Sequence, residues 1–286
     1  MIYLNLVGGL GNQLFEYAFA REVQYKTGQK ICISTYEIVA HDKKRKPTLM
    51  EYNLSKNVSF TQKKLPWYVH RRNYISKVLR KISAKNYFSF FQKLGSYIWY
   101  SEEIIELKDT NADKIFIGGY WQSEIYFKEV VEELHKELIP RNLSDTNKIL
   151  LNKIKSEKSI CLHIRRGDYV GTTYQVCTVD YYKRALEMIR QYSEATIFVF
   201  SDDIEWVKKT ITIPGKHYFV EDKNPDYIDL FLMSNCHSFI ISNSTFSWWA
   251  QELGWQEGKI VIAPNKWHAT KKCDSIYLKN WSIVDV

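Results

Sequence analysis

Two adjacent arginines follow an apolar run of the sequence, and they are the residues best suited to chemistry. They belong to the segment HIRRGDY at residues 163–169. A guanidinium group is permanently charged, and its planar fork matches phosphate oxygens two at a time. We interpret Arg165 and Arg166 as a diphosphate clamp, with His163 as a hydrogen-bonding group and Asp168 as a base. Because strand side chains alternate, one arginine should face the ligand and the other should tie down structure; an interdomain ion-pair network is the alternative.

A second candidate for phosphate binding is the hydroxyl-rich run SNSTFSWW at residues 242–249. It passes from a β-branched run into a helical pattern. The backbone N–H and hydroxyl groups around Asn243, Ser244, Thr245 and Phe246 would then surround an anion at a helix N-terminus. The alternative is an ordinary Ser/Thr helix cap followed by tryptophans of the core. The arginine pair favours the anion site.

A glycine-rich turn, GGLGNQ at residues 8–13, follows the first β-branched run. Gly9 and Gly11 would let the backbone approach a ligand closely. Asn12 and Gln13 carry carboxamides that suit sugar hydroxyls. The pattern is neither the dinucleotide fingerprint nor a Walker A loop, and a simple tight turn is the alternative.

Three carboxylates are further candidates. Asp202 and Asp203 follow a β-branched run, where they could bind a metal, cap a helix or hydrogen-bond a ribose or a base. No further acidic cluster with ligand spacing accompanies them, and the histidines lack metal-like spacing, so we predict no metal site. Asp229 begins the apolar face of a helical pattern. A buried carboxylate there could accept two hydrogen bonds from the edge of guanine.

Short β-branched runs alternate with helical patterns along the chain, which predicts an α/β fold with mainly parallel sheets. A helix stop and a polar turn predict two domains, residues 1–145 and 146–286. Two facing, doubly wound Rossmann-like domains would bind ligands at the carboxyl ends of their strands. The expected strands are residues 2–7, 31–34, 115–117, 159–164, 196–201, 217–220, 239–242 and 260–263. The expected helices are residues 12–26, 123–138, 179–192, 227–235 and 246–253.

The net charge of +8 is unevenly distributed over the 286 residues. Residues 41–93 contain 14 Lys and Arg against Asp42 and Glu51, a balance of +12. We expect a basic helical insertion at about residues 41–100. Its charge favours an anionic partner, either nucleic acid or a membrane face, and a merely solvated insertion is the alternative.

The cysteine content and the hydropathy of the sequence indicate the cellular compartment of the protein. The five cysteines form no CxxC pair, so neither a disulfide framework nor a zinc ribbon is indicated. No stretch approaches the roughly 20 apolar residues that cross a bilayer, and no secretory signal precedes the first strand. We therefore expect a cytoplasmic protein.

Taken together, the motifs resemble those of the bacterial α-1,2-fucosyltransferases of glycosyltransferase family 11. They span residues 8–250, whereas the basic segment carries none of them. The HxRRxD element is shared with other fucosyltransferases, and the hydroxyl run narrows the match to this family. In chain order the motifs are GGLGNQLFEYA at 8–18, GYWQSE at 119–124, HIRRGDY at 163–169, FSDD at 200–203 and NSTFSWW at 243–249.

The resemblance implies a GT-B fold and transfer of L-fucose, with inversion, from GDP-β-L-fucose to the 2-hydroxyl of a terminal β-galactoside. GDP-fucose would be a co-substrate held by the carboxyl-terminal half, with no cofactor and no metal. Arg165 would clamp the β-phosphate, Thr245 and its neighbours the diphosphate, and His163 would lie near the nucleoside. Asp229 would read guanine. The alternative is a metal-independent GT-B transferase with another fucose linkage or another nucleotide sugar.

The acceptor side is less determined. Asp168 is the preferred base and Glu16 the alternative, because the glutamate that related α-1,6 enzymes carry five residues after the motif aspartate is Thr173 here. Trp121, Gln122 and Tyr17 belong to family motifs and are assigned to acceptor binding. If the acceptor glycan is carried on a polyprenyl diphosphate, the basic segment would dock on anionic lipid at the inner membrane face. A nucleic-acid-binding protein or a lectin would leave the diphosphate clamp without a purpose.

Overall fold

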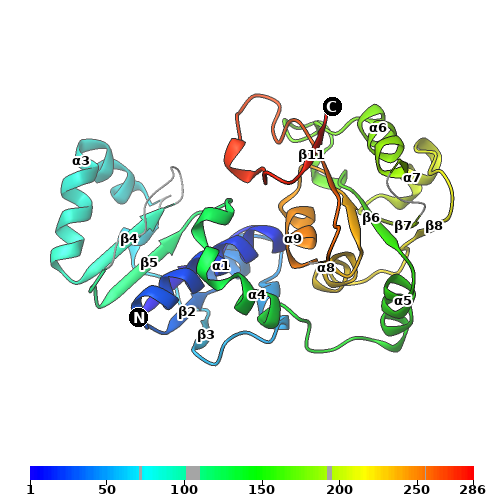
Figure 1. The fold of residues 1–286 in the computed structure, drawn as a ribbon. Helices are drawn as coiled ribbons and strands as arrows, with labels where there is room; N and C mark the ends of the chain where they lie inside the picture. The colour runs from blue at the N-terminus through cyan, green and yellow to red at the C-terminus, as the bar shows by residue number, and fades with distance from the viewer. Residues whose placement is uncertain (71–72, 101–109, 192–194, 255) are drawn as a thin grey trace. The chain divides into compact units, whose positions relative to one another are not determined.

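The computed structural model describes residues 1–286 except 71–72, 101–109, 192–194 and 255. The chain forms two compact units, Met1–Ile139 and Pro140–Val286 (Figure 1). The division falls at residue 139, slightly before the expected boundary at 145, because α4 (Val131–Glu137) ends there and Pro140 cannot continue a helix. No helix in the described part of the chain has the length and apolar character needed to span a membrane.

The first unit contains a five-stranded, fully parallel sheet in the order β3-β2-β1-β5-β4. The apolar residues of the three central strands, β2, β1 and β5, are buried in the core. The strands are β1 (Ile2–Asn5), β2 (Ile31–Ser34), β3 (Val58–Thr61), β4 (Ser96–Tyr100) and β5 (Lys114–Gly118). The other α-helices of this unit are α1 (Leu10–Thr27), α2 (Tyr36–His41) and α3 (Tyr74–Lys93).

The second unit contains a six-stranded, fully parallel sheet in the order β11-β10-β9-β6-β7-β8. Parallel neighbours require crossover helices, which the chain supplies between the strands. The strands are β6 (Ser159–Ile164), β7 (Thr196–Ser201), β8 (His217–Phe219), β9 (Ser238–Ile240), β10 (Val261–Pro264) and β11 (Ser282–Val284). The helices are α5 (Asp145–Ser156), α6 (Val179–Arg190), α7 (Ile204–Thr210), α8 (Asp226–Ser234) and α9 (Thr245–Leu253). Tyr192, at the expected end of α6, lies outside the described residues.

The expectation of a helical insertion at 41–100 is only half right. The segment does contain α3, but it also supplies β3 and β4, the two edge strands of the first sheet. Strand β3 is partly exposed and lacks the continuous apolar pattern by which central strands are recognised. Strand β4, with the sequence SYIWY, is largely buried and does carry an aromatic and β-branched pattern. The basic segment is therefore an integral part of the first unit.

Candidate functional site

The order of strands in the second sheet identifies where a ligand binds. Strand β6 lies between β9 and β7, and the chain proceeds from β6 toward one edge of the sheet and from β9 toward the other. The carboxyl ends of β6 and β9 are therefore the topological switch point, where open α/β sheets bind ligands. The HIRRGDY segment begins with the last two residues of β6, and the SNSTFSWW segment follows β9. The two motifs thus meet at this point of the sheet.

Arg165 carries the accessible positive charge of this site. Its Nη2 lies 2.7 Å from Asp168 Oδ1 and its Nη1 lies 3.0 Å from Asp202 Oδ2. Burial opposes the charge, but Asp202 and Asp168 outweigh it and raise the pKa of the guanidinium. About a third of the side chain, 31%, stays exposed. Two carboxylates therefore hold a cation in place while leaving part of its fork open to an anion.

Arg166 is engaged within the fold. Its guanidinium lies 3.7 Å from the centre of the Trp206 ring, and its Nε lies 3.2 Å from Asp203 Oδ2. Its backbone N–H donates to Asp202 Oδ1 over 2.8 Å. These contacts fasten the end of β6 to α7, so of the two arginines it is Arg165 that is placed to bind a ligand. The expected division of roles between the pair agrees with this geometry, but the assignment of Arg166 to donor binding does not.

The adjacent carboxylates Asp202 and Asp203 form ion pairs with the two arginines, and one of them caps a helix. Asp203 caps α7, because its Oδ1 accepts from the backbone N–H of Trp206 over 3.2 Å. Asp202 accepts from the backbone N–H of Arg166 and pairs with Arg165, so it orients the Arg165 guanidinium. In the part of the chain that the structure describes, no group of three or more His, Cys, Asp or Glu side chains could hold a metal ion.

His163 joins the two motifs. Its Nδ1 lies 2.8 Å from Ser247 Oγ and 3.1 Å from Ser242 Oγ, and its ring packs against Phe246. Burial, with the charge of Arg165 adding to it, lowers the pKa of His163 to about 3. The imidazole is therefore neutral at physiological pH. It acts as a buried brace between β6 and the start of α9.

This brace predicts a pH-dependent stability. The pKa of His163 in the folded state is below its ordinary value of 6.5, so the unfolded state binds the proton more tightly. The stability that neutral His163 contributes is present above pH 6.5 and is lost as the pH falls. We expect the free energy of unfolding to fall more steeply below pH 6.5 in the wild type than in His163→Asn, by up to about 1.4 kcal/mol per pH unit. Urea unfolding between pH 5 and 7 measures both slopes; equal slopes would contradict the assignment.

The hydroxyl run forms the N-terminus of α9. Ser244 is the N-cap, and its Oγ accepts from the backbone N–H of Phe246 over 3.3 Å. Thr245 and Phe246 are partly exposed, whereas Asn243 is buried and donates to Tyr174 O over 2.8 Å. Asn243 thus shapes the turn. The first residues of α9 are the part that can present N–H and hydroxyl groups to an anion.

Asp229 lies in the first turn of α8, which begins where the loop after β8 leaves the carboxyl edge of the sheet. Its Oδ1 accepts from Asn224 Nδ2 over 3.0 Å, and Asn224 is held in turn by Asn147 Nδ2 at 3.0 Å. Burial raises the pKa of Asp229 to about 7, and Asp226 and Asp222 add to the effect. The carboxyl is thus partly buried, oriented, and balanced between its charged and neutral forms near neutral pH.

In the first unit, the glycine turn is built by the two carboxamides that follow it. Gly8 has φ +80°, and a Cβ there would lie 3.0 Å from Asn12 Nδ2, so glycine is required. Gln13 is fully buried and donates to Gly8 O over 3.0 Å and to Lys46 O over 2.7 Å. Asn12 Oδ1 accepts from Gln122 Nε2 over 2.9 Å.

Gly9 and Gly11 also belong to the glycine turn and to the start of α1. The carbonyl of Gly9 accepts from the backbone N–H groups of Asn12 and Gln13, and Gly11 is buried inside α1. Gln13 therefore shapes the turn, which corrects its expected contact with the donor sugar. Asn12 and Gln122 bind one another across the turns that follow β1 and β5.

Two residues assigned to the acceptor belong to the core of the first unit. Trp121 is 1% exposed, stacks on Phe19 with ring centres 3.7 Å apart, and donates from Nε1 to Gly118 O. Tyr17 is fully buried and its hydroxyl donates to Glu137. Neither ring offers a face to a sugar, so their assignment to the acceptor is wrong.

Glu16, the alternative base, is also unsuited to its expected role. It is fully buried, and its Oε2 accepts from the backbone N–H of Val7 over 3.0 Å. Burial raises the pKa of this carboxyl well above its usual range. Because Glu16 has no exposed surface and one of its oxygens is held by the backbone of Val7, a sugar hydroxyl cannot reach it, and Glu16 does not fit the role of general base in this structure.

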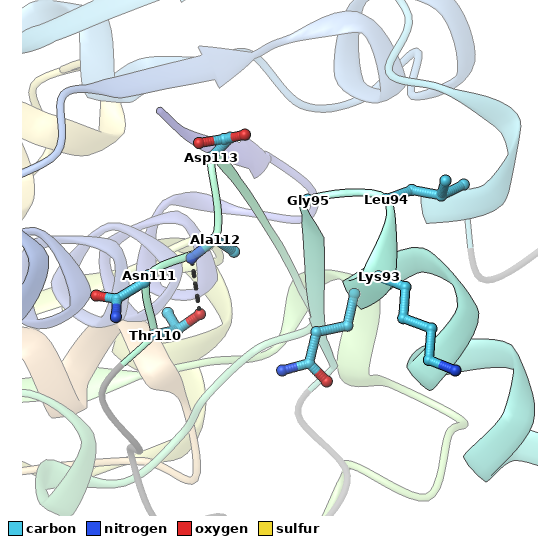
Figure 2. Close-up of a pocket in the computed structure, with 8 residues that line it drawn as sticks. Lys93, Leu94, Gly95, Thr110, Asn111, Ala112 and Asp113 are labelled. Atoms are coloured by element: carbon cyan, nitrogen blue, oxygen red, sulfur yellow. Dashed lines mark hydrogen bonds between the residues drawn. The ribbon is translucent and has the colours of Figure 1, made fainter.

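A hollow of about 640 Å³ lies in the first unit, away from all of these residues (Figure 2). It opens where β4 and β5 begin, at the amino edge of the sheet, whereas the glycine turn follows the carboxyl end of β1. Its lining residues are Gln92, Lys93, Leu94, Gly95, Thr110, Asn111, Ala112 and Asp113. It contains none of the motif residues, and we do not assign it to the reaction.

Comparison with known proteins decides the family. A sequence model described as glycosyl transferase family 11 matches residues 1–285. The chain belongs to glycosyltransferase family 11. It is therefore an enzyme that transfers a sugar.

Two proteins are similar to this family-11 chain in sequence, and one solved structure is similar to it in fold. The alpha-1,2-colitosyltransferase of Escherichia coli is 31% identical, over 96% of this chain and 95% of its own. The human galactoside alpha-(1,2)-fucosyltransferase 1 is 24% identical, over 68% of this chain and 53% of its own. The fucosyltransferase NodZ from Bradyrhizobium has a TM-score of 0.54 and 13% identity, covering 87% of this chain and 92% of that one. The predicted α/β fold of GT-B type, with Rossmann-like units and parallel sheets, is confirmed.

Several residues of the family-11 site were not anticipated. Tyr169 packs against the Arg165 guanidinium, and its hydroxyl donates to Asn243 O over 3.4 Å. Asn224, which orients Asp229, lies in a polar loop with no motif. The position of Tyr169 within HIRRGDY was a usable signal, whereas Asn224 offered none because its role depends on its contact with α8.

Proposed function

We propose that the enzyme transfers L-fucose from GDP-β-L-fucose to the 2-hydroxyl of a terminal β-galactoside. The observation that carries this proposal is the partly open Arg165 at the switch point of the second sheet, beside the N-terminus of α9. That arrangement suits a diphosphate. The names of the family-11 relatives support the sugar and the linkage, since one transfers fucose to galactosides in α-(1,2) linkage.

The mechanism follows from where charge develops. As the glycosidic bond to the diphosphate breaks, negative charge grows on the leaving oxygen and positive charge grows on the sugar ring, as in glycoside hydrolysis. Arg165, the backbone N–H of Thr245 and the positive N-terminal end of α9 stabilise the leaving diphosphate. Their combined positive potential takes the place of a metal ion, so we propose that no metal is needed. Attack from the opposite face converts the β-linked donor into an α-linked product.

We assign the general base to Asp168. Its Oδ1 pairs with Arg165 at 2.7 Å and its side chain is 34% exposed, so it lies beside the proposed diphosphate site and can be reached from solvent. We expect Asp168→Asn to lower kcat about 100-fold with little change in KM for the donor, because proton transfer typically contributes that much. Steady-state kinetics with saturating acceptor measures this. Because Asp168 also positions Arg165, a parallel rise in the Kd of GDP would assign it to donor binding instead.

The proposed function is tested by a transfer assay with GDP-β-L-fucose and three acceptors: lactose, N-acetyllactosamine and Galβ1,3GalNAc. Each is measured with and without EDTA. A product that carries fucose on O2 of galactose, formed in EDTA, is the expected result. Loss of activity in EDTA that Mn²⁺ restores would refute the metal-free mechanism. Hydrolysis of GDP-fucose without transfer would retain the donor and reject these acceptors.

A second candidate function differs from the first only in the sugar that the enzyme transfers. The 31% identical relative is named for colitose rather than fucose transfer. A colitose donor with the same nucleotide should therefore be assayed in parallel, and a higher kcat/KM for it would replace fucose in the proposal. A different fucose linkage would show in the product by NMR.

A further inference from the structure

Helix α3 presents an apolar stripe to solvent. Ile75, Val78, Leu79 and Ile82 recur at the spacing that places them on one face of a helix. All four are exposed, by 55%, 39%, 41% and 77% respectively. A surface helix ordinarily turns such a stripe toward the core. Here the stripe is left without a covering layer from the described residues.

The backbone of α3 is non-helical at Ser83 (φ −157°, ψ 101°), so the stripe belongs to the helical segment before this break. Both segments of α3 pack on the first unit. Ser76 is fully buried and its Oγ donates to Trp67 O over 3.0 Å, while Tyr87 and Phe91 pack against Ile98 of β4. Figure 1 shows α3 beside β4, at the edge of the first sheet. The segment that carries the stripe is therefore held to the first unit at Ser76, and the segment after Ser83 is held through Tyr87 and Phe91.

Positive charge surrounds the stripe. Lys77, Lys81 and Lys85 on α3 are exposed. Between Glu51 and Glu102 the sequence contains seven lysines and three arginines and no acidic residue. Two further aromatic side chains near the start of the helix are exposed, Trp67 by 43% and Tyr74 by 79%. Apolar residues flanked by lysines, with aromatic residues beside them, are the composition of helices that lie in the interface of an anionic membrane.

We propose that α3 docks on an anionic lipid surface, with the stripe of Ile75, Val78, Leu79 and Ile82 inserted among the acyl chains and the lysines on the headgroups. A second copy of the chain is a poorer occupant, because two segments with ten positive charges and no negative ones repel one another. An acidic peptide would satisfy the lysines, but it would leave the aliphatic stripe without a comparable apolar partner. The inference does not depend on which sugar the enzyme transfers.

The test is co-sedimentation of the full-length protein with vesicles of phosphatidylcholine alone or with 30% phosphatidylglycerol. We expect binding to the anionic vesicles that weakens as salt is raised. Ile82→Gln should lower the partition coefficient roughly 10-fold, because it removes one inserted aliphatic side chain. The double variant Lys77→Gln/Lys81→Gln should lower it roughly 30-fold, since each lysine near an anionic surface contributes about 5-fold.

Matched controls come from the second unit. Ile149 on α5 is 71% exposed, so Ile149→Gln changes an isoleucine of similar exposure elsewhere. Lys271→Gln/Lys272→Gln removes the same charge from another exposed site. Neither control should alter vesicle binding, and none of these variants should change transfer to a soluble acceptor.

Three outcomes would overturn the proposal. Equal binding to neutral and anionic vesicles would remove the role of the lysines. Unchanged binding by Ile82→Gln would remove the role of the stripe. A dimer seen by sedimentation velocity that Ile82→Gln abolishes, without vesicle binding, would assign the face to self-association.

Discussion

Replacing Arg165 with alanine is expected to lower kcat/KM for transfer about 1000-fold, the effect typical of removing a cation that stabilises a leaving phosphate group. Arg165 is held by Asp168 and Asp202 and keeps 31% of its side chain exposed. The positive charge is therefore oriented before the diphosphate leaves. Arg165→Lys should recover only part of the rate, because an ammonium group cannot form two parallel hydrogen bonds. Steady-state kinetics with GDP-fucose measures both variants.

Arg166→Ala is the matched control. Its guanidinium stacks on Trp206 and pairs with Asp203, so its removal should lower Tm while kcat/KM changes less than about 10-fold. Calorimetry and kinetics on the two alanine variants separate a ligand contact from a structural one. If Arg166→Ala lost as much activity as Arg165→Ala at unchanged Tm, the division of roles between the arginines would be wrong.

The predictions from sequence succeeded where a physical rule links the position of a residue to its surroundings. The rule that parallel strands bind ligands at their carboxyl ends brought HIRRGDY and SNSTFSWW together. The expected difference between Arg165 and Arg166 rested on strand alternation, which does not apply to them because β6 ends at Ile164. The parallel sheets themselves followed from the alternation of β-branched and helical patterns, because parallel neighbours need crossover helices.

The sequence was less informative where the same type of residue can either contact a ligand or stabilise the fold. Gln13 has the carboxamide expected of a sugar contact, yet both of its polar atoms bind the backbone around the glycine turn. Trp121 has the ring expected of a sugar platform, yet it stacks on Phe19. The choice between these uses depends on neighbours from distant parts of the chain. Edge strand β3 was missed because its partial exposure removes the apolar signal, whereas β4 has an apolar, aromatic sequence that the basic surroundings obscured.

Asp229→Asn is expected to weaken GDP binding by about 1000-fold at pH 8, because two hydrogen bonds to a charged group are lost together. We propose that Asp229 accepts hydrogen bonds from N1–H and N2–H₂ of guanine. An asparagine at this position has one acceptor and would point its own donor at one of them. Isothermal titration calorimetry with GDP measures the loss. With inosine diphosphate, which lacks the 2-amino group, the wild type should bind more weakly than with GDP, and the variant should hardly distinguish the two.

The pH dependence tests the same carboxyl independently. The pKa of Asp229 is raised to about 7, chiefly by burial, so in the ligand-free protein the folded state holds this proton more tightly than the unfolded state. The stability contributed by the neutral form is fully present below the ordinary carboxyl pKa and is lost as the pH rises through about 7. Guanine recognition has the opposite sign, because only the carboxylate accepts both hydrogen bonds. GDP affinity should therefore rise about 10-fold between pH 6 and pH 8 in the wild type and stay flat in Asp229→Asn.

Asp226→Asn supplies the matched control, because it changes an exposed acid in the same turn of α8. Asp226 helps to raise the pKa of Asp229 by like-charge repulsion. Its neutralisation should move the midpoint of the GDP affinity profile to lower pH and leave the affinity at pH 8 unchanged. An affinity profile that Asp226→Asn does not move, or GDP binding that survives in Asp229→Asn, would place guanine elsewhere in the second unit. The expected pair of results would tie nucleotide choice in this family-11 enzyme to one partly buried carboxyl whose pKa is raised chiefly by burial and further by Asp226.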